Sequence, residues 1–246
     1  MEKTELVKRA SDLALRAKKQ STVTSTHFLT PAEKYELQHT SFLPDGVEQL
    51  FSGGCENAER TVCLFYPDWM EEPDITEFLS AVRFKSYFGA PGHRDYLGAI
   101  LGSGVNREYI GDILIKDDTA SVICAPSVAD WIKNLEKAGR CTVKGSIIAL
   151  SEIEPPEIKR KELSFTVMSP RLDAVVSGIF NISRTEASNA IASGLVSLNY
   201  AEALKNDARI SEGDILSLRG KGKAQISSFG GTSRKGRLYI RAEIYC

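Results

Sequence analysis

The stretch SPRLDAVVSGIFNISRTEASNAIASGLVSLNY, residues 169–200, contains two consecutive helix patterns and then a short strand. Ser183, with Glu186 three residues later, forms a capping box at the start of the second helix. Gly194 is placed to end that helix, and residues 195–199 are apolar enough for a strand. This order of elements predicts two helices packed on a small antiparallel sheet.

Charge is distributed unevenly along the chain. The 246 residues carry a formal net charge of -1, which taken alone excludes a histone-like nucleic-acid binder. Residues 168–246, however, contain 11 basic and 7 acidic side chains, a net +4, so the preceding residues carry −5. Residues 215–242 contain seven basic residues, no acidic residue and many glycines. This composition indicates a phosphate-binding surface, with a solvated basic loop as the alternative.

Two arginines stand at the predicted helix starts. Arg171 and Arg184 each lie in a first helical turn, where the helix dipole opposes a positive charge. Free backbone N–H groups beside a guanidinium make a good phosphate site. We therefore expect both helix starts to contact an RNA backbone.

The rest of the chain predicts two further modules and an α+β protein overall. Residues 4–19 have the spacing of an amphipathic helix, and TPAEKYEL begins a second helix with Thr30 as its cap. Strands interleaved with helices follow, as in a ferredoxin-like or RRM-like fold. The expected modules are a small helical one, an RRM-like one and the basic two-helix one, at residues 1–54, 55–166 and 167–246.

The C-terminal module resembles the RNA-binding domain first described in small-subunit ribosomal protein S-four. The matching features are RLD at 171–173, Ser-Arg at 183–184, I-x-x-G-x-V-x-x-N at 191–199 and Gly-Asp at 213–214. GHRDYLGAILGSGVNREYIGDILI, residues 92–115, is similar to the YlmH-type proteins, and this resemblance extends over essentially the whole chain. It implies a cytoplasmic protein that binds the large ribosomal subunit and tRNA and acts in the rescue of stalled nascent chains. The YlmH-type proteins also carry an older cell-division label.

The candidate RNA-binding residues come from the resemblance and from the basic segment. By position, the resemblance implies Arg171, Arg184, Asn189, Lys205, Arg219 and Lys221, while Asp173 and Glu186 are structural partners or caps. The basic, glycine-rich segment adds Lys223, Arg234, Lys235 and Arg237. A second RNA contact is expected in the middle module at His93, Arg94 and Arg107.

Aromatic residues offer a separate way to bind bases. Phe84, Tyr87 and Phe88 could form a stacking platform, but without the usual glycine-aromatic motif we expect core packing. Trp69 and Trp131 are also expected to be core or half-buried. Phe229 and Tyr239, which lie among basic residues, are the better candidates for stacking.

Enzyme signatures are incomplete. His93-Arg94-Asp95 copies a kinase triplet without the Asn that should follow, and Arg171-Leu172-Asp173 resembles a pseudouridine synthase triplet without room for a catalytic domain. We expect no catalytic residue, cofactor, metal site, disulfide framework, signal peptide or membrane span. The sequence thus favours a non-enzymatic protein that binds rRNA or tRNA, with no membrane or small-molecule partner. An RNA-modifying enzyme and a cell-division adaptor remain the alternatives.

Overall fold

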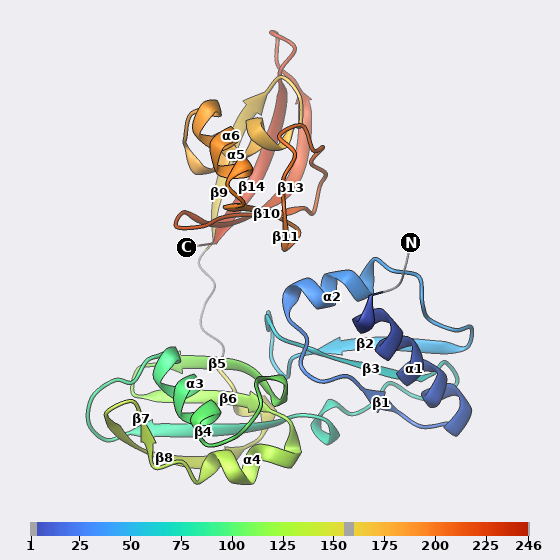
Figure 1. Ribbon diagram of the computed structural model, residues 1–246, viewed down its shortest axis with the longest axis vertical. Helices are drawn as coiled ribbons and strands as arrows, with labels where there is room; N and C mark the ends of the chain where they lie inside the picture. Colours follow the sequence, from blue (N-terminus) through green and yellow to red (C-terminus); the bar gives the residue numbers. More distant parts are fainter. Residues whose placement is uncertain (1–3, 155–159, 246) are drawn as a thin grey trace. The chain divides into compact units, whose positions relative to one another are not determined.

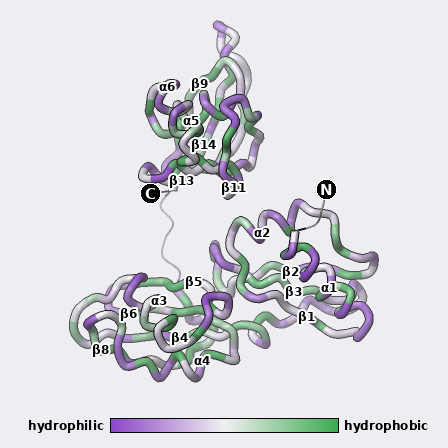
Figure 2. Tube along the Cα trace, viewed as in Figure 1, coloured by the Kyte–Doolittle hydropathy of each residue, from purple (hydrophilic) through white to green (hydrophobic). Residues whose placement is uncertain are grey.

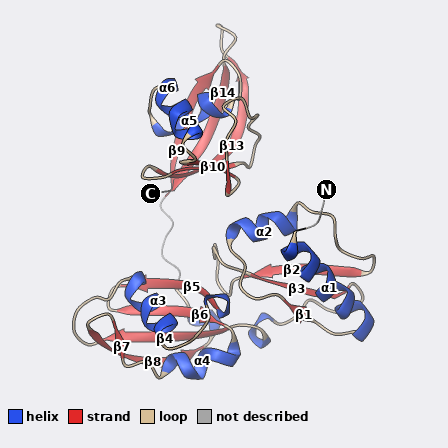
Figure 3. Ribbon diagram, in the orientation of Figure 1, coloured by secondary structure: helices blue, strands red, loops and turns tan. Residues whose placement is uncertain are grey.

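The computed structural model describes residues 4–154 and 160–245, and the chain divides into two compact units, residues 1–156 and 157–246. We call them unit 1 and unit 2. Each combines helices with antiparallel sheets (Figures 1 and 3), which confirms the predicted α+β class. In the described parts, no helix is long and apolar enough to cross a membrane.

The first part of unit 1 is two helices on a three-stranded sheet with the strand order β1-β3-β2. Its elements are α1 (Glu5–Gln20), β1 (Thr24–Ser25), α2 (Pro31–Gln38), β2 (Val47–Ser52) and β3 (Val62–Pro67). The expectation of a small helical module ending at residue 54 is therefore wrong. β3 is buried along its whole length, so it needs neighbours on both sides, and β2 pairs with it from Val47↔Pro67 to Ser52↔Val62.

The second part of unit 1 has the strand-helix-strand-strand-helix-strand order of a ferredoxin-like fold, as predicted. Its elements are β4 (Ser80–Ser86), α3 (His93–Gly102), β5 (Ile110–Lys116), β6 (Thr119–Cys124), α4 (Pro126–Lys133), β7 (Lys137–Ala138) and β8 (Cys141–Ile148). The sheet order is β5-β6-β4-β8-β7, with β4 and β6 near its centre. Short 3₁₀ turns lie at Ile75–Glu77, Arg107–Tyr109 and Leu150–Glu152.

The two sheets of unit 1 are joined by apolar packing. On β4, Val82 and Phe84 belong to the core beneath α3 and α4, so the neighbouring Ala81 lies on the opposite sheet face. Ala81 shares a buried cluster there with Phe28 and Leu64 from the first part of the chain. Part of this sheet face is thus covered by the first part of unit 1.

A close approach at Gly145 fixes the packing of α4 on the sheet. A Cβ atom at this position would lie 2.4 Å from the backbone oxygen of Lys133 and 2.9 Å from the Phe84 ring. We expect Gly145→Ala to lower the free energy of unfolding of unit 1 by about 1–3 kcal/mol, because neither neighbour can yield cheaply. Urea unfolding followed by tryptophan fluorescence measures this, since both tryptophans of the chain lie in unit 1.

Gly98 is the matched control for that substitution. It lies inside α3, where an added Cβ atom meets nothing within 4 Å. Gly98→Ala should therefore raise the stability of unit 1 by about 0.5–1 kcal/mol. Equal effects of the two substitutions would contradict the packing argument.

Unit 2 is a six-stranded sheet, in the order β11-β10-β12-β13-β14-β9, with two helices on one face (Figure 1). Its elements are β9 (Arg160–Val167), α5 (Leu172–Phe180), α6 (Arg184–Ala192), β10 (Val196–Leu198), β11 (Ala201–Glu202), β12 (Ile215–Leu218), β13 (Gly222–Thr232) and β14 (Leu238–Tyr245). Leu172 and Ile191 of the helices share one core with Ile240 of the sheet. This is the two-helix arrangement predicted from the sequence.

The predicted boundary at residues 166/167 differs from the structure. β9 pairs with β14 along its whole length, from Arg160↔Tyr245 to Val167↔Leu238. The strand therefore belongs to the sheet of unit 2 and not to the middle module. Phe165 of β9 also packs beneath Gly178 of α5, where an added Cβ atom would lie 2.3 Å from the ring. A strand pattern alone does not reveal which sheet it joins.

Candidate nucleic-acid interface

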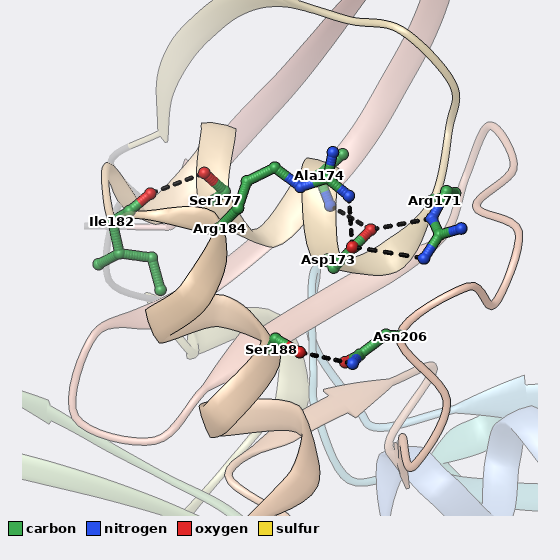
Figure 4. Close-up of polar contacts among 8 residues, drawn as sticks. All are labelled: Arg171, Asp173, Ala174, Ser177, Ile182, Arg184, Ser188 and Asn206. Atoms are coloured by element: carbon green, nitrogen blue, oxygen red, sulfur yellow. Dashed lines mark hydrogen bonds and ion pairs between the residues drawn. The ribbon is translucent and has the colours of Figure 1, made fainter.

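The starts of α5 and α6 are joined by one carboxylate (Figure 4). Asp173 accepts a hydrogen bond from Nε of Arg171 at 3.2 Å, another from the guanidinium of Arg184, and a third from the backbone N–H of Ala174 at 2.8 Å. The side chain of Asp173 is only 10% exposed, whereas those of Arg171 and Arg184 are 45% and 57% exposed. A shielded acid thus holds two solvent-facing guanidinium groups in fixed positions.

The charge of Asp173 is stabilised by these contacts. Burial by itself would raise the pKa of this carboxyl group, but hydrogen bonds from Arg184 and Arg171 and their positive charges outweigh burial. The net result is a pKa below the ordinary value. Asp173 is therefore ionised at neutral pH and offsets the unfavourable placement of two cations at helix N-termini.

The backbone at the start of α5 is not open to a phosphate, contrary to the helix-start hypothesis. The N–H of Leu172 donates to the carbonyl of Ala208 at 2.8 Å, and the N–H of Asp173 donates to the carbonyl of Asn206 at 3.1 Å. The segment 205–209 thus takes the amides that a phosphate would need. At Arg171 only the guanidinium remains available for RNA.

The same segment brings two further cations to this place. Arg209 forms an isolated antiparallel bridge with Arg171, and Lys205 is exposed three residues before Ala208. The side-chain amide of Asn206 donates to Oγ of Ser188 on α6 at 2.5 Å, so the segment is fastened to both helices (Figure 4). Arg209 was not among the predicted residues, because only the fold pairs it with Arg171.

The start of α6 carries the predicted capping box between Ser183 and Glu186. Hydrogen bonds from Ser183 lower the pKa of Glu186, and the positive charge of Lys221 contributes to the same shift. Lys221 therefore lies near this helix start, and it lines a pocket with Asn181, two residues before Ser183. Asn189 is exposed on α6. We call the cations on this side of unit 2 the helix-start cluster: Arg171, Arg184, Lys205, Arg209 and Lys221.

The remaining predicted residues of unit 2 lie elsewhere. Arg219 is exposed at the turn after β12, where its backbone N–H donates to the carbonyl of Leu195. Lys223 neighbours the buried Ala224, so it lies on the sheet face away from the helices, with Nζ 4.8 Å from the centroid of the Tyr245 ring. Arg237 is held by Thr166, whose backbone oxygen accepts a hydrogen bond from its guanidinium at 2.6 Å.

The β13–β14 hairpin ends in Arg234 and Lys235, both exposed. Figure 1 shows this tip extending beyond the rest of unit 2, and Figure 2 shows it in hydrophilic colours. The tip and the helix-start cluster are therefore two separate groups of cations within unit 2.

In unit 1, the three residues predicted for a second RNA contact differ in their surroundings. His93 and Arg94 are exposed at the first two positions of α3. Arg107 donates to the backbone oxygens of Ile110 and Gly111, and burial lowers the pKa of its guanidinium. Arg107 thus fastens the start of β5, while His93 and Arg94 face solvent.

The aromatic residues depart from the sequence-based expectation. Phe84 is buried as expected, but Tyr87 and Phe88 are 57% and 83% exposed. Trp69 and Trp131 were also expected in or near the core and are 69% and 62% exposed. Local apolarity predicted burial at these positions, but Trp69, Tyr87 and Phe88 follow the ends of β3 and β4. Trp131 lies at an exposed position within α4, where its Nε1 donates to Oγ of Ser103 at 3.2 Å. Tyr239 is 46% exposed.

Comparison with known proteins agrees with this architecture. A family model described as "Putative RNA-binding domain in YlmH" matches residues 71–152. The chain is 31% identical over 221 residues to the ribosome-associated protein quality control protein P2 of Bacillus subtilis (strain 168), covering 89% of this chain and 86% of that protein.

Among solved structures, the cell division protein YlmH from Streptococcus pneumoniae has a similar fold. The match has a TM-score of 0.50 and 15% sequence identity, and it covers 63% of this chain and 98% of that one. The identity and coverage of the Bacillus protein, together with the YlmH domain in the middle of the chain, establish the family. This chain belongs to the YlmH family.

Proposed function

We propose that this chain is a ribosome-associated protein that holds structured RNA, rRNA or tRNA on the large ribosomal subunit, through the helix-start cluster of unit 2. In this proposal unit 2 acts as an S-four-type RNA-binding unit, and the protein acts in the cytoplasm in translation or in the quality control of stalled ribosomes. The observation that carries the proposal is the pair of exposed guanidinium groups held by the shielded Asp173.

This arrangement suits recognition of a phosphate backbone. A guanidinium group presents donors in a planar fork that matches phosphate oxygens, and fixing it beforehand reduces the entropy lost on binding. Asp173 neutralises one of its two arginines, so the pair keeps one net positive charge. Lys205, Arg209 and Lys221 add to it. The name of the Bacillus relative supports the ribosome as the place where this surface acts.

We also propose that the protein acts by binding and not by catalysis. Asp173 stands in the triplet that resembles a pseudouridine synthase, and it would have to be the catalytic acid of an RNA-modifying enzyme. Its two oxygens instead accept hydrogen bonds from Arg171, Arg184 and the Ala174 amide. These bonds direct the carboxylate into the protein, where it positions the arginines.

Co-sedimentation with purified ribosomal subunits tests the proposal. We expect the full chain to sediment with the large subunit, and the double variant Arg171→Ala/Arg184→Ala to lose about 10- to 100-fold in affinity, because two phosphate contacts are removed. Lys8→Ala, which removes an exposed lysine of α1 in unit 1, is the matched control and should bind as the wild type does.

Crosslinking after sedimentation identifies the RNA. Crosslinks from unit 2 to large-subunit rRNA or to tRNA would support the proposal. Association that survives digestion of the RNA, or equal binding by the double variant and the wild type, would overturn it. Loss of an RNA modification in a deletion strain would instead favour the enzyme alternative.

A further inference from the structure

The loop between β4 and α3 exposes two adjacent aromatic side chains. Phe88 is 83% exposed and Tyr87 is 57% exposed. Aromatic rings of this size usually dominate the interfaces in which they are found, and leaving two neighbours in water is unfavourable for the free protein. The pair therefore marks a surface that is covered when the protein is bound.

The backbone holds these rings out in a defined conformation. The N–H of Ser86 donates to the carbonyl of Asp118 at 2.9 Å, and Oγ of Ser86 donates to the carbonyl of Phe88 at 3.2 Å. Gly89 then reverses the chain with φ +79, and a Cβ atom there would lie 2.8 Å from Sγ of Cys141. Position 89 thus excludes a side chain on two grounds, and the exposure of the rings is built into the turn.

Cations lie on the segments next to the aromatic pair. Lys85 precedes it on β4, directly opposite Lys144 on β8. His93 and Arg94 follow it at the start of α3. Arg140 lies in the β7–β8 turn, and that turn packs against α3, since a Cβ atom on the adjacent Gly139 would lie 2.6 Å from the Asp95 carboxylate.

Two of the acidic residues of this region, Asp95 and Asp118, have partners within the protein. Asp118 pairs with Lys85 at 3.9 Å, and Asp95 accepts the N–H of Gly92 at 2.9 Å. Asp117 and Glu136, in the β5–β6 turn and before β7, are exposed, so the four acidic side chains of this region equal Lys85, Lys144, Arg94 and Arg140 in number. Exposed rings next to the exposed guanidinium groups of Arg94 and Arg140 fit a ligand with flat apolar surfaces and negative charges, which describes unpaired nucleotides.

The sheet itself does not offer this chemistry. On the sheet face opposite the helices, β4 carries Arg83 and Lys85. Their partners on β6 are Ser121 and Thr119. Phe84 lies under the helices at 0% exposure, in contact with Tyr96. The exposed aromatic residues of this domain thus lie in the turn at the end of β4 and not on these positions of the sheet face.

We propose that Tyr87 and Phe88, with Arg94 and Arg140 beside them, bind one or two unpaired nucleotides of RNA by stacking. This inference rests on the proposed function, because it adds a contact with single-stranded RNA to the binding of structured RNA by unit 2. Stacking on an aromatic ring tolerates any base, so the site reads the absence of pairing and not a sequence.

Binding to a single-stranded oligouridylate of about 12 nucleotides, measured with the full chain, tests the inference. Tyr87→Ala/Phe88→Ala should weaken this binding about tenfold or more and leave the binding of a paired stem-loop RNA within about twofold. The exchanged pair Tyr87→Phe/Phe88→Tyr keeps both rings and should retain the affinity. Trp69→Ala, which removes an equally exposed ring outside residues 71–152, is the matched control and should have no effect.

Photocrosslinking gives a readout that does not depend on how unit 2 binds. An oligouridylate containing 4-thiouridine should crosslink to the tryptic peptide SYFGAPGHR, residues 86–94, which cleavage after Lys85 and Arg94 releases. Crosslinks confined to other peptides, or an alanine pair that binds the oligouridylate as the wild type does, would overturn the inference. If the stem-loop is still bound in that case, the proposed function stands without it. If the wild type binds neither RNA, both fail.

Discussion

Raising the monovalent salt concentration from about 50 to about 200 mM should weaken the binding of the full chain to its structured RNA about a thousandfold. We take six exposed cations of unit 2 as the phosphate contacts, namely the five of the helix-start cluster and Arg219. Each neutralised phosphate releases counterions, so about six contacts give a steep logarithmic dependence on salt. A fluorescence titration with the crosslinked rRNA or tRNA fragment, at several salt concentrations and constant magnesium, measures the slope.

Single variants separate the contacts that make up this slope. Arg184→Ala and Arg209→Ala should each reduce the magnitude of the slope of log binding constant against log salt concentration by about one, because each removes one phosphate contact. Arg107→Ala should leave it unchanged, since the Arg107 guanidinium is bound to the backbone of β5. A slope near zero for the wild type would contradict the electrostatic account of this surface.

The sequence identified most elements of the fold, because their signals are local. The capping boxes at Thr30 and Ser183 mark two helix starts, and both are present in the structure. The sequence did not reveal which strands pair with one another. Strands interleaved with helices were expected after residue 54, but nothing within residues 62–67 or 160–167 indicates which distant strand pairs with β3 or β9. Sheet pairing depends on contacts across the whole chain, so module boundaries at 54 and 166 were misplaced.

The candidate site shows the same limit. Arg171 and Arg184 could be selected from their helix-start positions, and the resemblance suggested a structural role for Asp173. Their hydrogen bonds to one carboxylate, however, depend on how α5 and α6 pack. Arg209 and the loss of free amides at α5 both follow from the 205–209 segment, which has no regular pattern in the sequence. Tyr87 and Phe88 were assigned to the core because apolar composition does not tell a turn from a strand end.

Removing the acid at the centre of the helix-start cluster should weaken RNA binding, although it removes a negative charge. In Asp173→Ala, Arg171 and Arg184 lose their shared partner and are left at two helix starts with an opposing dipole. We expect unit 2 to lose about 2 kcal/mol of stability, less than for a fully buried pair because both arginines are about half exposed. Hydrogen exchange of the α5 amides in the full chain measures this, and the tryptophan transition of unit 1 is the internal control.

The pH dependence of the stability of unit 2 tests whether the ionised form of Asp173 is what stabilises it. The folded state holds the pKa of Asp173 below its ordinary value, so the carboxylate stabilises unit 2 at neutral pH and loses that contribution as the pH falls through the folded pKa. The stability difference between the wild type and Asp173→Ala should therefore shrink below about pH 4. A difference that stays constant down to pH 2 would assign it to packing and not to the ion pairs.

RNA affinity distinguishes a positioning acid from a merely repulsive one. If Asp173 only repelled phosphates, Asp173→Ala would bind RNA more tightly and its salt slope would rise. If the carboxylate fixes the two guanidinium groups, as its hydrogen bonds indicate, affinity at neutral pH should fall about tenfold with the slope nearly unchanged, because the cations remain but are no longer held in place. The RNA affinity of Asp173→Asn should lie between those of the wild type and Asp173→Ala. An amide oxygen can still accept one guanidinium hydrogen bond, but it carries no charge to hold both arginines.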